Sequence, residues 1–502
     1  MLRQACVLGV DIGTSSSKGV LVTLDGTIVA TATREHEVLR PAPGHVEMDA
    51  HVWWDEAAGI IRELLAAPGA PEPALVRSVG VSGMGPCVLV TDLAGEPRRP
   101  AVLYGIDSRA TAQIERLTDR LGGADVIRER CGSALSTQAV GPKLAWLAEH
   151  EPQAVAGDWR LFQPSTWLGW KLTGAYYLDH HSASQCTPMY DAVEQGWHGP
   201  WAAEVAAGAQ LPPLVWPGDV VGGVSAQAAA ETGLAAGTPV IAGTIDAWSE
   251  AISVGAHRVG DLMLMYGTTM FLINTVDKPL TSPTLWGTVG ALPGTRNLAG
   301  GMATSGAITG WLRELFGSPG YPELLALAEA AGPGAHGLLM LPYFAGERTP
   351  VADPDARGVL AGLTVAHTRG DLYRAALEAT AFGVRHNVAA IEQAGGQVER
   401  IVAVGGGAQG SLWTQIVSDV TGLPQAIPAK TIGAAFGAAF LAAGAVGEPD
   451  IEQWNPIVET RTPQPSARAD YDELYALYLD LYSATAPTVH ALATRERLRA
   501  ER

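Results

Sequence analysis

The second half of the chain contains the segment Pro342-Tyr-Phe-Ala-Gly-Glu-Arg-Thr-Pro-Val-Ala-Asp-Pro-Asp-Ala-Arg-Gly358, which continues as Val-Leu-Ala-Gly362-Leu-Thr-Val-Ala-His-Thr-Arg-Gly-Asp371-Leu-Tyr-Arg-Ala-Ala-Leu-Glu378. The proline-rich part predicts a polar loop, and the residues after Gly358 predict a short strand. An amphipathic helix follows, with Asp371 as its expected N-cap. The order of loop, strand and helix is typical of a connection inside an α/β domain.

The composition limits the class of protein. A chain of 502 residues is too long for one hydrophobic core, so two or three domains are expected. A hydrophobic content of 47% and a charged content of 17% are typical of a globular protein. The net charge of −18 argues against a nucleic acid or an anionic membrane as partner. ATP remains a candidate ligand, because backbone N–H groups and Mg²⁺ can hold its phosphates.

The cysteines and the N-terminus predict a cytoplasmic protein. Four scattered cysteines, none in a CxxC pair, are typical of reduced thiols. The first residues lack the apolar region of a signal peptide, and no run of about 18 apolar residues occurs in the chain.

Strands and helices alternate along the first part of the chain. An apolar strand at residues 7–10 ends in Asp11, and a polar turn follows at residues 13–18. The pair Asp25-Gly26 predicts a hairpin between further strands at residues 19–23 and 27–31. The pattern then predicts a helix at 53–66, a strand at 76–82 and a helix at 110–121, which together indicate an α/β fold.

The pattern of a strand, a Gly-Thr turn and a second strand occurs twice in the chain. A strand at residues 262–266 leads into Gly267-Thr268-Thr269 and then into a strand at residues 270–275. This repeat predicts two related domains that face each other across a cleft, with the crossover at residues 237–246. We therefore expect an N-terminal domain at residues 1–250, a C-terminal domain at 251–450 and a helical tail at 451–502. Aromatic residues at helical spacing between Tyr471 and Tyr482 predict that the tail packs on the body of the protein.

Asp11 and the turn after it have the chemistry of a phosphoryl-transfer site. A carboxylate at the end of a strand can hold Mg²⁺, often through water. The N–H groups and hydroxyls of Thr14, Ser15 and Ser16 can surround phosphate oxygens. Lys18 either adds positive charge there or is solvated.

Two other patterns have readings that the sequence argues against. Residues 405–410 satisfy GxGxxG and would suggest a dinucleotide site, but this site requires an acid about 20 residues later, and residues 425–430 contain Lys430 and no acid. A dehydrogenase therefore remains an alternative that the sequence disfavours. The pair His180-His181 after Asp179 could suggest a metal, but adjacent histidines point apart, so a loop is expected.

Several of these motifs together resemble the FGGY family of carbohydrate kinases, and within it the xylulokinase-like branch. The resemblance is carried by Val10-Asp-Ile-Gly-Thr, by the segment from residue 342 to residue 378, and by Lys143-Leu-Ala-Trp146-Leu-Ala-Glu-His150. Gln138 and Val140 depart from the first family signature, whereas the second signature fits completely. The similarity extends from Val10 to about Gly447.

The resemblance implies two actin-like (ribonuclease H-like) α/β domains with an interdomain cleft, and ATP-dependent phosphorylation of a sugar or polyol hydroxyl. Asp246, in Gly243-Thr-Ile-Asp246-Ala, is then the general base and, with Asp11, a Mg²⁺ ligand. The family implies that the nucleotide is bound by Thr14, Ser15, Ser16, Lys18, Gly267, Thr268, Gly306, Gly405, Gly406, Gly407 and Ala408.

The expected sugar pocket departs from the family. Met84-Gly-Pro-Cys87 stands where xylulokinases usually have Gln-Met-His-Gly, and Tyr104 stands where they have Trp. Asp107 and Arg109 are retained. We expect Met84, Tyr104, Asp107 and Arg109, together with Asp246, to bind the sugar.

The leading substrate is a pentulose such as D-xylulose, because of the Gly-Glu-Arg-Thr-Pro loop. Gluconate, another ketose or a polyol is the alternative, since a lost hydrogen-bond partner changes discrimination strongly. Glycerol fits less well, because the loop differs from the glycerol kinase pattern. A non-catalytic sugar- or nucleotide-responsive regulator is the alternative from another class, and it predicts loss of Asp11 or Asp246. The sequence leaves a homodimer open.

Overall fold

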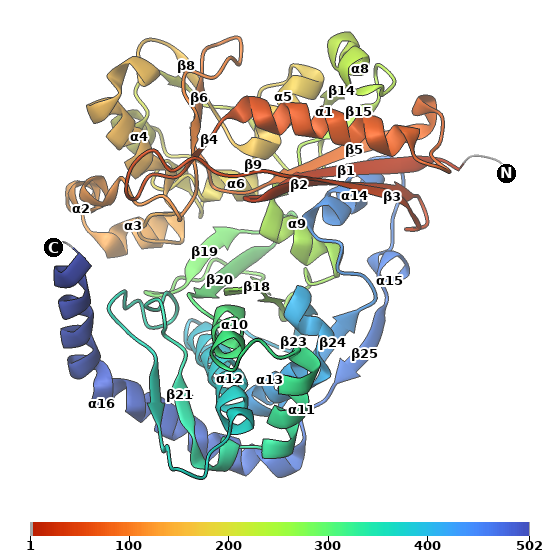
Figure 1. The fold of residues 1–502 in the computed structure, drawn as a ribbon. Helices are drawn as coiled ribbons and strands as arrows, with labels where there is room; N and C mark the ends of the chain where they lie inside the picture. Colours follow the sequence, from red (N-terminus) through yellow and green to blue (C-terminus); the bar gives the residue numbers. More distant parts are fainter. Residues whose placement is uncertain (1–3, 501–502) are drawn as a thin grey trace.

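The computed structural model describes residues 4–500, which form two lobes, each built on a seven-stranded sheet (Figure 1). The first sheet has the order β14-β15-β5-β1-β2-β3, and a seventh strand, β16, also pairs with β5. Its strands are β1 (Cys6–Ile12), β2 (Ser16–Thr23), β3 (Ile28–Glu35), β5 (Val76–Gly83), β14 (Val220–Gly223), β15 (Pro239–Ile241) and β16 (Thr244–Ile245).

The second sheet has the order β19-β20-β18-β17-β23-β24-β25. Its strands are β17 (Asp261–Tyr266), β18 (Met270–Val276), β19 (Trp286–Val289), β20 (Arg296–Met302), β23 (Arg400–Val404), β24 (Gln425–Pro428) and β25 (Ile457–Arg461). In both sheets a first strand pairs antiparallel with the next one and parallel with a later one, β1 with β2 and β5, and β17 with β18 and β23. The repeat seen in the sequence therefore corresponds to a repeat of topology.

Successive side chains of β1 and of β17 point to opposite faces of their sheets, and both faces are buried. In β1, Leu8 and Val10 pack with α1 (Ala50–Ala66) and α5 (Pro164–Thr173), whereas Val7 belongs to a different core. In β17, Leu264 packs with α12 (Arg369–Gln393) and α13 (Ser411–Thr421), whereas Met263 faces the same core as Val7.

Two helices, α9 (Asp246–Ser253) and α14 (Ala434–Gly444), lie in this shared core between the two sheets. Figure 1 shows both between the upper and the lower lobe. They approach each other very closely, because a Cβ atom on Gly437 would lie 1.8 Å from the backbone oxygen of Ser249. The Ser249 hydroxyl also donates to the backbone oxygen of Ala434. The close contact of α9 with α14 thus links the lobes.

Further helices enlarge the N-terminal lobe, and one helix covers the C-terminal lobe. An outer core holds α2 (Thr111–Arg120), α3 (Ala124–Cys131), α4 (Val140–His150) and α7 (Gly199–Val205). The last helix, α16 (Arg468–Ala500), runs along the base of the C-terminal lobe in Figure 1 and buries Tyr471 and Tyr478 beside Phe382. No helix within residues 4–500 is long and apolar enough to span a membrane.

Three local expectations from the sequence were wrong. Thr368 is the N-cap of α12, and Asp371 is its third residue; the Asp371 carboxylate accepts from the backbone N–H of Thr368, which completes a capping box. The pair His180-His181 begins the short helix α6 (His180–Ser184) instead of lying in a loop, because Asp179 caps it. The polar turn ends at Ser15, since Ser17 and Lys18 already pair with Ile12 and Asp11 in the sheet.

Candidate active site

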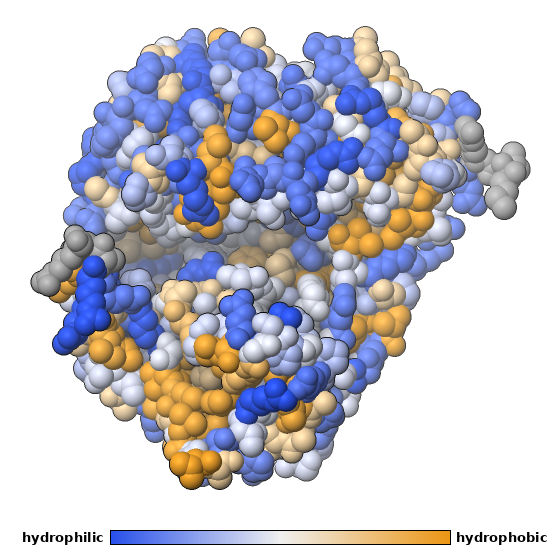
Figure 2. Space-filling view, in the orientation of Figure 1, coloured by the Kyte–Doolittle hydropathy of each residue, from blue (hydrophilic) through white to orange (hydrophobic). Residues whose placement is uncertain are grey.

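A cavity of about 840 Å³ lies between the lobes and is lined by residues of both. Figure 2 shows the surface hollowed between the upper and the lower lobe. The lining includes the sequence-predicted residues Asp11, Thr14, Ser15, Ser16, Lys18, Tyr104, Asp246, Gly405 and Gly406. Residues predicted from opposite ends of the chain are therefore brought together in one place.

The sheet aligns the two expected catalytic carboxylates. Asp11, near the end of β1, pairs in parallel with Ser82 of β5, and Thr244 of β16 pairs with the same Ser82 from the other side. The backbones of Asp11 and Thr244 are thus about 10 Å apart, two strand spacings. Asp246 follows Thr244 by two residues and opens α9, so its carboxylate leaves the sheet at the same edge as Asp11.

Burial changes the acidity of both carboxylates. Burial raises the pKa of Asp11 to about 8, the negative charge of Asp246 adds to this effect, and a hydrogen bond that the Ser82 hydroxyl donates (2.9 Å) opposes it. Burial also raises the pKa of Asp246 to about 6, while the backbone N–H of Ala247 donates to its Oδ1 at 2.7 Å. Two carboxylates that face one cavity and resist ionisation together are suited to a cation or a proton-transfer role.

Glu250 is a third carboxylate at this end of the cavity, and the sequence analysis missed it. It lies one turn after Asp246 on α9 and lines the same cavity. Burial raises its pKa to about 7, and the charge of Asp246 contributes while Lys18 opposes. The spacing of four residues between two acids on a predicted helix is the signal that could have identified it.

The turn after β1 carries the hydroxyls expected to face phosphates. The backbone N–H of Gly13 donates to the oxygen of Ser16 at 3.0 Å and closes the turn. The hydroxyls of Thr14 and Tyr104 share a hydrogen bond of 2.9 Å. Tyr104 therefore connects the phosphate turn with the expected sugar end of the cavity.

The second Gly-Thr turn lies on the opposite lobe, between β17 and β18. The backbone oxygens of Gly267 and Thr268 accept from N–H groups at the start of α10 (Gly306–Leu315). Thr269, and not the predicted Thr268, lines the cavity, because the side chains of successive residues leave the turn in different directions. Gly267 and Gly306 also lie outside the lining and serve to hold the turn against the helix.

The glycine loop after β23 lies beside this turn. Gly405 has a φ of +87°, and a Cβ atom there would lie 2.7 Å from the backbone oxygen of Tyr266. Gly405, Gly406 and Gln409 line the cavity, whereas Gly407 packs against the Trp413 ring and Ala408 is buried. The part of the predicted loop that faces the cavity is thus shorter than expected.

The structure places Asp107 and Arg109 outside the cavity lining. Their side chains are fully buried, and Arg109 pairs with Asp107 at 2.8 Å and with Glu47 at 2.7 Å. The backbone N–H of Val46 donates to the same Asp107 carboxylate at 2.6 Å. A carboxylate whose oxygens are engaged in this way is poorly placed to accept from a sugar hydroxyl, so the structure gives both residues a structural role and their sugar binding stays a prediction.

Met84 also lies outside the lining. It is buried in the core of the N-terminal lobe, and its neighbour Gly85 reaches the cavity instead. Lys143, in contrast, supports the site indirectly, because its ammonium donates to the backbone oxygen of Tyr104 at 2.9 Å. Of the five expected sugar contacts, Tyr104 and Asp246 line the cavity.

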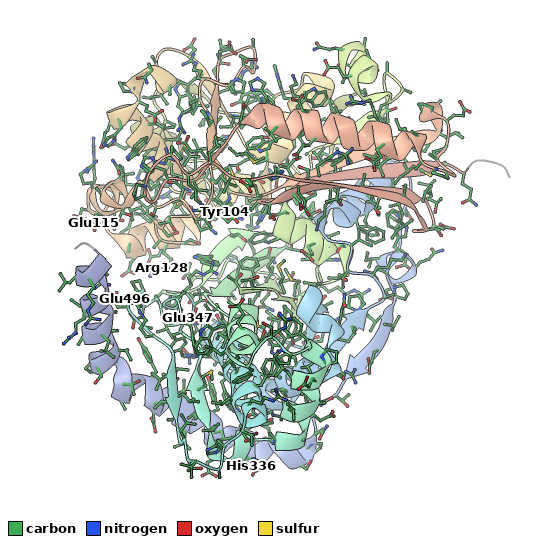
Figure 3. The ribbon with its side chains drawn as sticks, in the orientation of Figure 1. Tyr104, Glu115, Arg128, His336, Glu347 and Glu496 are labelled. Atoms are coloured by element: carbon green, nitrogen blue, oxygen red, sulfur yellow. The ribbon has the colours of Figure 1, made fainter. Side chains whose placement is uncertain are left out.

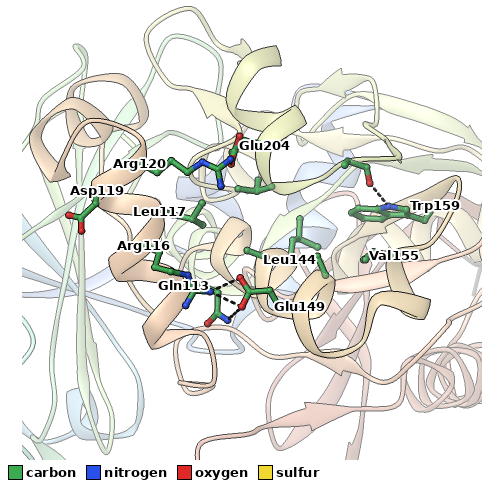
Figure 4. A pocket seen from close by; sticks show the side chains of 14 residues that line it. Gln113, Arg116, Leu117, Asp119, Arg120, Leu144, Glu149, Val155, Trp159 and Glu204 are labelled. Carbon is green, nitrogen blue, oxygen red and sulfur yellow. Dashed lines mark hydrogen bonds and ion pairs between the residues drawn. The ribbon is translucent and has the colours of Figure 1, made fainter.

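A second cavity of about 810 Å³ lies wholly within the N-terminal lobe, between α2, α4 and α7 (Figure 4). Its floor is apolar and includes Leu117, Leu144 and Trp159. Two ion pairs lie at its rim, Arg116 with Glu149 and Arg120 with Glu204. None of the predicted site residues lines it, so the interdomain cavity is the candidate active site.

Comparison with known proteins shows the family of the chain. Residues 6–253 match the N-terminal domain of the FGGY family of carbohydrate kinases, and residues 262–446 match the C-terminal domain of the same family. A xylulose kinase from Staphylococcus epidermidis is 27% identical, over 97% of this chain and 98% of its own length. A glycerol kinase from Alkalilimnicola ehrlichii is 32% identical, over 88% of this chain and 90% of its own.

A solved structure is similar over the whole chain. The crystal structure of xylulose kinase from Rhodospirillum rubrum is 32% identical, superposes with a TM-score of 0.89, and covers 97% of this chain and 100% of its own. The expected pair of actin-like domains is thereby confirmed, as is the expected enzyme class. The chain belongs to the FGGY family of carbohydrate kinases.

Proposed function

We propose that this kinase transfers the γ-phosphoryl group of ATP to a hydroxyl of a pentulose, with D-xylulose as the first candidate. The observation that carries the proposal is the pair Asp11 and Asp246, which leave adjacent parts of one sheet edge and face the same cavity. The xylulose kinases from S. epidermidis and R. rubrum, similar over nearly the whole chain, support the choice of substrate.

Asp246 has the position and acidity of a general base. It accepts one hydrogen bond from the backbone, and its second oxygen is available to a substrate hydroxyl. With a pKa of about 6 the carboxylate is ionised at neutral pH and remains basic enough to take the proton of the hydroxyl. Tyr104 and Ala247 line the wall beside it and orient the acceptor.

The two turns hold the nucleotide from opposite lobes. Thr14, Ser15 and Ser16 would contact the phosphates from the N-terminal lobe, and Thr269 from the C-terminal lobe. Gly405 and Gly406 would lie against the adenosine. Closure of the lobes would exclude water and limit hydrolysis of ATP.

The residues present fit a magnesium ion. Asp11 and Asp246 offer hard oxygen ligands, and burial together with their mutual repulsion disfavours their charges until a cation compensates them. Within the described residues no cluster of three metal-binding side chains occurs, so phosphate oxygens and water would complete the coordination. When bound, Mg²⁺ would neutralise charge on the β- and γ-phosphates.

A different polyhydroxy acceptor is the second candidate. The closed network of Asp107 and Arg109 and the proline at position 86 remove contacts that a xylulokinase pocket would offer. Gluconate, another ketose or a polyol therefore remains a candidate acceptor. A non-catalytic regulator is disfavoured, because both Asp11 and Asp246 are present and face the cavity. We place the enzyme in the cytoplasm, and its four unpaired, buried cysteines are consistent with a reducing compartment.

The test is ADP release from ATP and Mg²⁺ across D-xylulose, L-xylulose, D-ribulose, gluconate, glycerol and erythritol. We expect one strong acceptor, whose effect disappears in Asp246→Ala and persists in the control Asp119→Ala, an acid at the second cavity. Acceptor-dependent release that survives Asp246→Ala would remove the proposed base. If only gluconate or a polyol stimulates ADP release, that compound replaces the pentulose as the proposed acceptor.

A further inference from the structure

Arg348 is the one arginine among the residues that line the interdomain cavity. Lys18, the other cation of the lining, is accompanied by carboxylates, since it lies opposite Asp11 in the sheet and acts on Glu250. Arg348 forms no ion pair with a carboxylate among the described residues, although the charge of its neighbour Glu347 acts on it. Its guanidinium donates to one acceptor, the backbone oxygen of Met302 (3.2 Å). Most of its donors are therefore free.

The backbone that carries Arg348 is held firmly on both sides. The Glu347 carboxylate accepts from the backbone N–H groups of Ala303 and Arg348, both at 2.8 Å. The hydroxyl of Thr349 accepts from the N–H of Gly301 at 2.8 Å and donates to Asn387 at 2.6 Å. Both side chains are buried, so the loop is anchored to the end of β20 immediately before and after the arginine.

The helix α16 fixes the same loop from the outside. The hydroxyls of Tyr343 and Tyr478 share a hydrogen bond of 2.7 Å. Further along the loop, Asp353 accepts from Tyr482 at 2.8 Å and from His490 at 2.7 Å. The C-terminal helix thus has a role beyond packing, because it supports the segment that presents Arg348 to the cavity.

Tyr104 lies on the opposite side of the cavity from this loop. Figure 3 shows Tyr104 at the edge of the upper lobe and Glu347, the neighbour of Arg348, at the facing edge of the lower lobe. The positive charge of Arg348 reaches the Tyr104 phenol, where it acts against the burial that raises its pKa. Arg348 therefore faces the end of the cavity expected to hold the sugar, whereas Lys18 faces the carboxylates.

The Arg348 side chain is exposed at the cavity, and the buried side chains of Glu347 and Thr349 hold its backbone in place there. A structural arginine would be paired, as Arg357 of the same loop is with Glu496. The free donors of Arg348 instead match ligand oxygens, since a guanidinium presents five donors in a fixed plane.

We propose that Arg348 binds the sugar acceptor from the C-terminal lobe, donating hydrogen bonds to its oxygens opposite Tyr104. The inference rests on the proposed function and names a residue that recognises the acceptor. An acceptor held between Tyr104 and Arg348 contacts both lobes, so its binding favours the closed form.

The test compares Arg348→Met, Arg348→Lys and the control Arg357→Met with the wild type. We expect Arg348→Met to raise the KM for D-xylulose by about tenfold or more, which corresponds to about 1.4 kcal/mol, while the KM for ATP changes less than twofold. Arg348→Lys should recover part of the loss, and Arg357→Met should behave as the wild type. Equal thermal unfolding of the variants would show that the fold is kept.

Calorimetric titration of D-xylulose in the presence of Mg²⁺ and ADP measures the same interaction without turnover. A weakened Kd in Arg348→Met supports the proposal even if the wild type proves to be a poor kinase for this sugar. Binding by Arg348→Met within twofold of the wild type overturns the role of Arg348 and leaves the proposed kinase function intact. Failure of the proposed function is recognised separately, by the absence of a phosphorylated product from the wild type.

Discussion

At the residue scale, the acidity of the two carboxylates proposed for catalysis, Asp11 and Asp246, predicts a pH dependence. The pKa of Asp246 is raised to about 6 and that of Asp11 to about 8, in both cases above all by burial. Both groups must be ionised to take a proton or to hold a cation, so activity should rise as the pH increases through this window. We expect kcat/KM for the acceptor to be about tenfold or more lower at pH 6 than at pH 8.

A pH series from 5 to 9 at constant ionic strength measures this profile. A kcat/KM that stays constant between pH 6 and pH 8 would contradict the assignment of these carboxylates to proton transfer and cation binding.

Asp107 predicts an effect on stability and not on activity, because its buried pair with Arg109 stabilises the folded protein. Replacing it with alanine leaves the buried Arg109 guanidinium with Glu47 as its remaining carboxylate partner. Breaking a buried pair in this way typically costs about 3 kcal/mol or more. We expect Asp107→Ala to lower the urea midpoint strongly. A nearly unchanged midpoint combined with a large rise in the acceptor KM would show instead that Asp107 binds the sugar.

Single residues also show where sequence reasoning ends. Asp11 and Asp246 could be proposed from the sequence because Asp11 lies near the end of an apolar strand and Asp246 directly follows one, and strand ends converge at a sheet edge. The engagement of Asp107 could not be predicted, because its pair with Arg109, and the pair of Arg109 with Glu47, depend on packing that the sequence does not display. Arg348 escaped notice for the same reason, since its free donors become apparent only when the opposite lobe is in place.

At the scale of elements, the close contact between α9 and α14 predicts that a larger side chain at position 437 lowers the stability of the protein. Valine at position 437 would place a Cβ atom 1.8 Å from the Ser249 backbone oxygen and would force the two helices apart. Such overpacking costs about 1–3 kcal/mol, more than the roughly 1 kcal/mol that removing a helical glycine returns. Thermal unfolding should therefore occur at a lower temperature in Gly437→Val.

Gly444, at the end of the same helix, provides the matched control. No atom lies within 4 Å of a Cβ added there, so Gly444→Ala should leave the unfolding temperature unchanged or raise it. Equal effects at the two positions would mean that the helix contact does not limit side-chain volume.

The contact of α6 with β19 predicts sensitivity to acid. Nδ1–H of His181 donates to the backbone oxygen of Val289 at 2.7 Å, and its Nε2 accepts from Gln185 at 2.9 Å, so the ring is neutral. Burial lowers its pKa to about 3. The unfolded chain takes up the proton below about pH 6.5 and the folded chain does not, so stability is lost as the pH falls from 6.5.

At pH 5 this difference amounts to about 2 kcal/mol. Urea unfolding at pH 7 and pH 5 should show a larger decrease for the wild type than for His181→Gln, which lacks the ionisable ring. The same decrease in both proteins would place the acid sensitivity elsewhere.

The order of elements was more predictable than their ends. The hairpin at Asp25-Gly26 and the alternation of strands and helices follow from local chemistry. The first helix begins at Ala50 and not at residue 53, because Asp49 caps it, and a cap four residues before the first tryptophan is easily overlooked. The position of α14 between the two sheets could not be predicted, since it depends on contacts far apart in the sequence.

At the scale of the whole molecule, each lobe supplies half of the site. The N-terminal lobe provides Asp11, Asp246 and Tyr104, and the C-terminal lobe provides the second Gly-Thr turn, the glycine loop and Arg348. The shared core around α9 and α14 joins the lobes while leaving the cavity open between them. The topological repeat thus bears on the proposed function, because it places the cavity between two lobes that each supply part of its lining.

The most direct test of this account is to detect the phosphorylated product. Wild type and Asp246→Asn are incubated with ATP, Mg²⁺ and D-xylulose, and the reaction is followed by phosphorus NMR and mass spectrometry. We predict that the wild type forms a sugar phosphate monoester. Asp246→Asn should still bind ATP but should form the product at a rate that is lower than that of the wild type by about 10³-fold or more. Product formation by Asp246→Asn at close to the wild-type rate, or a wild type that phosphorylates no sugar or polyol, would contradict the account.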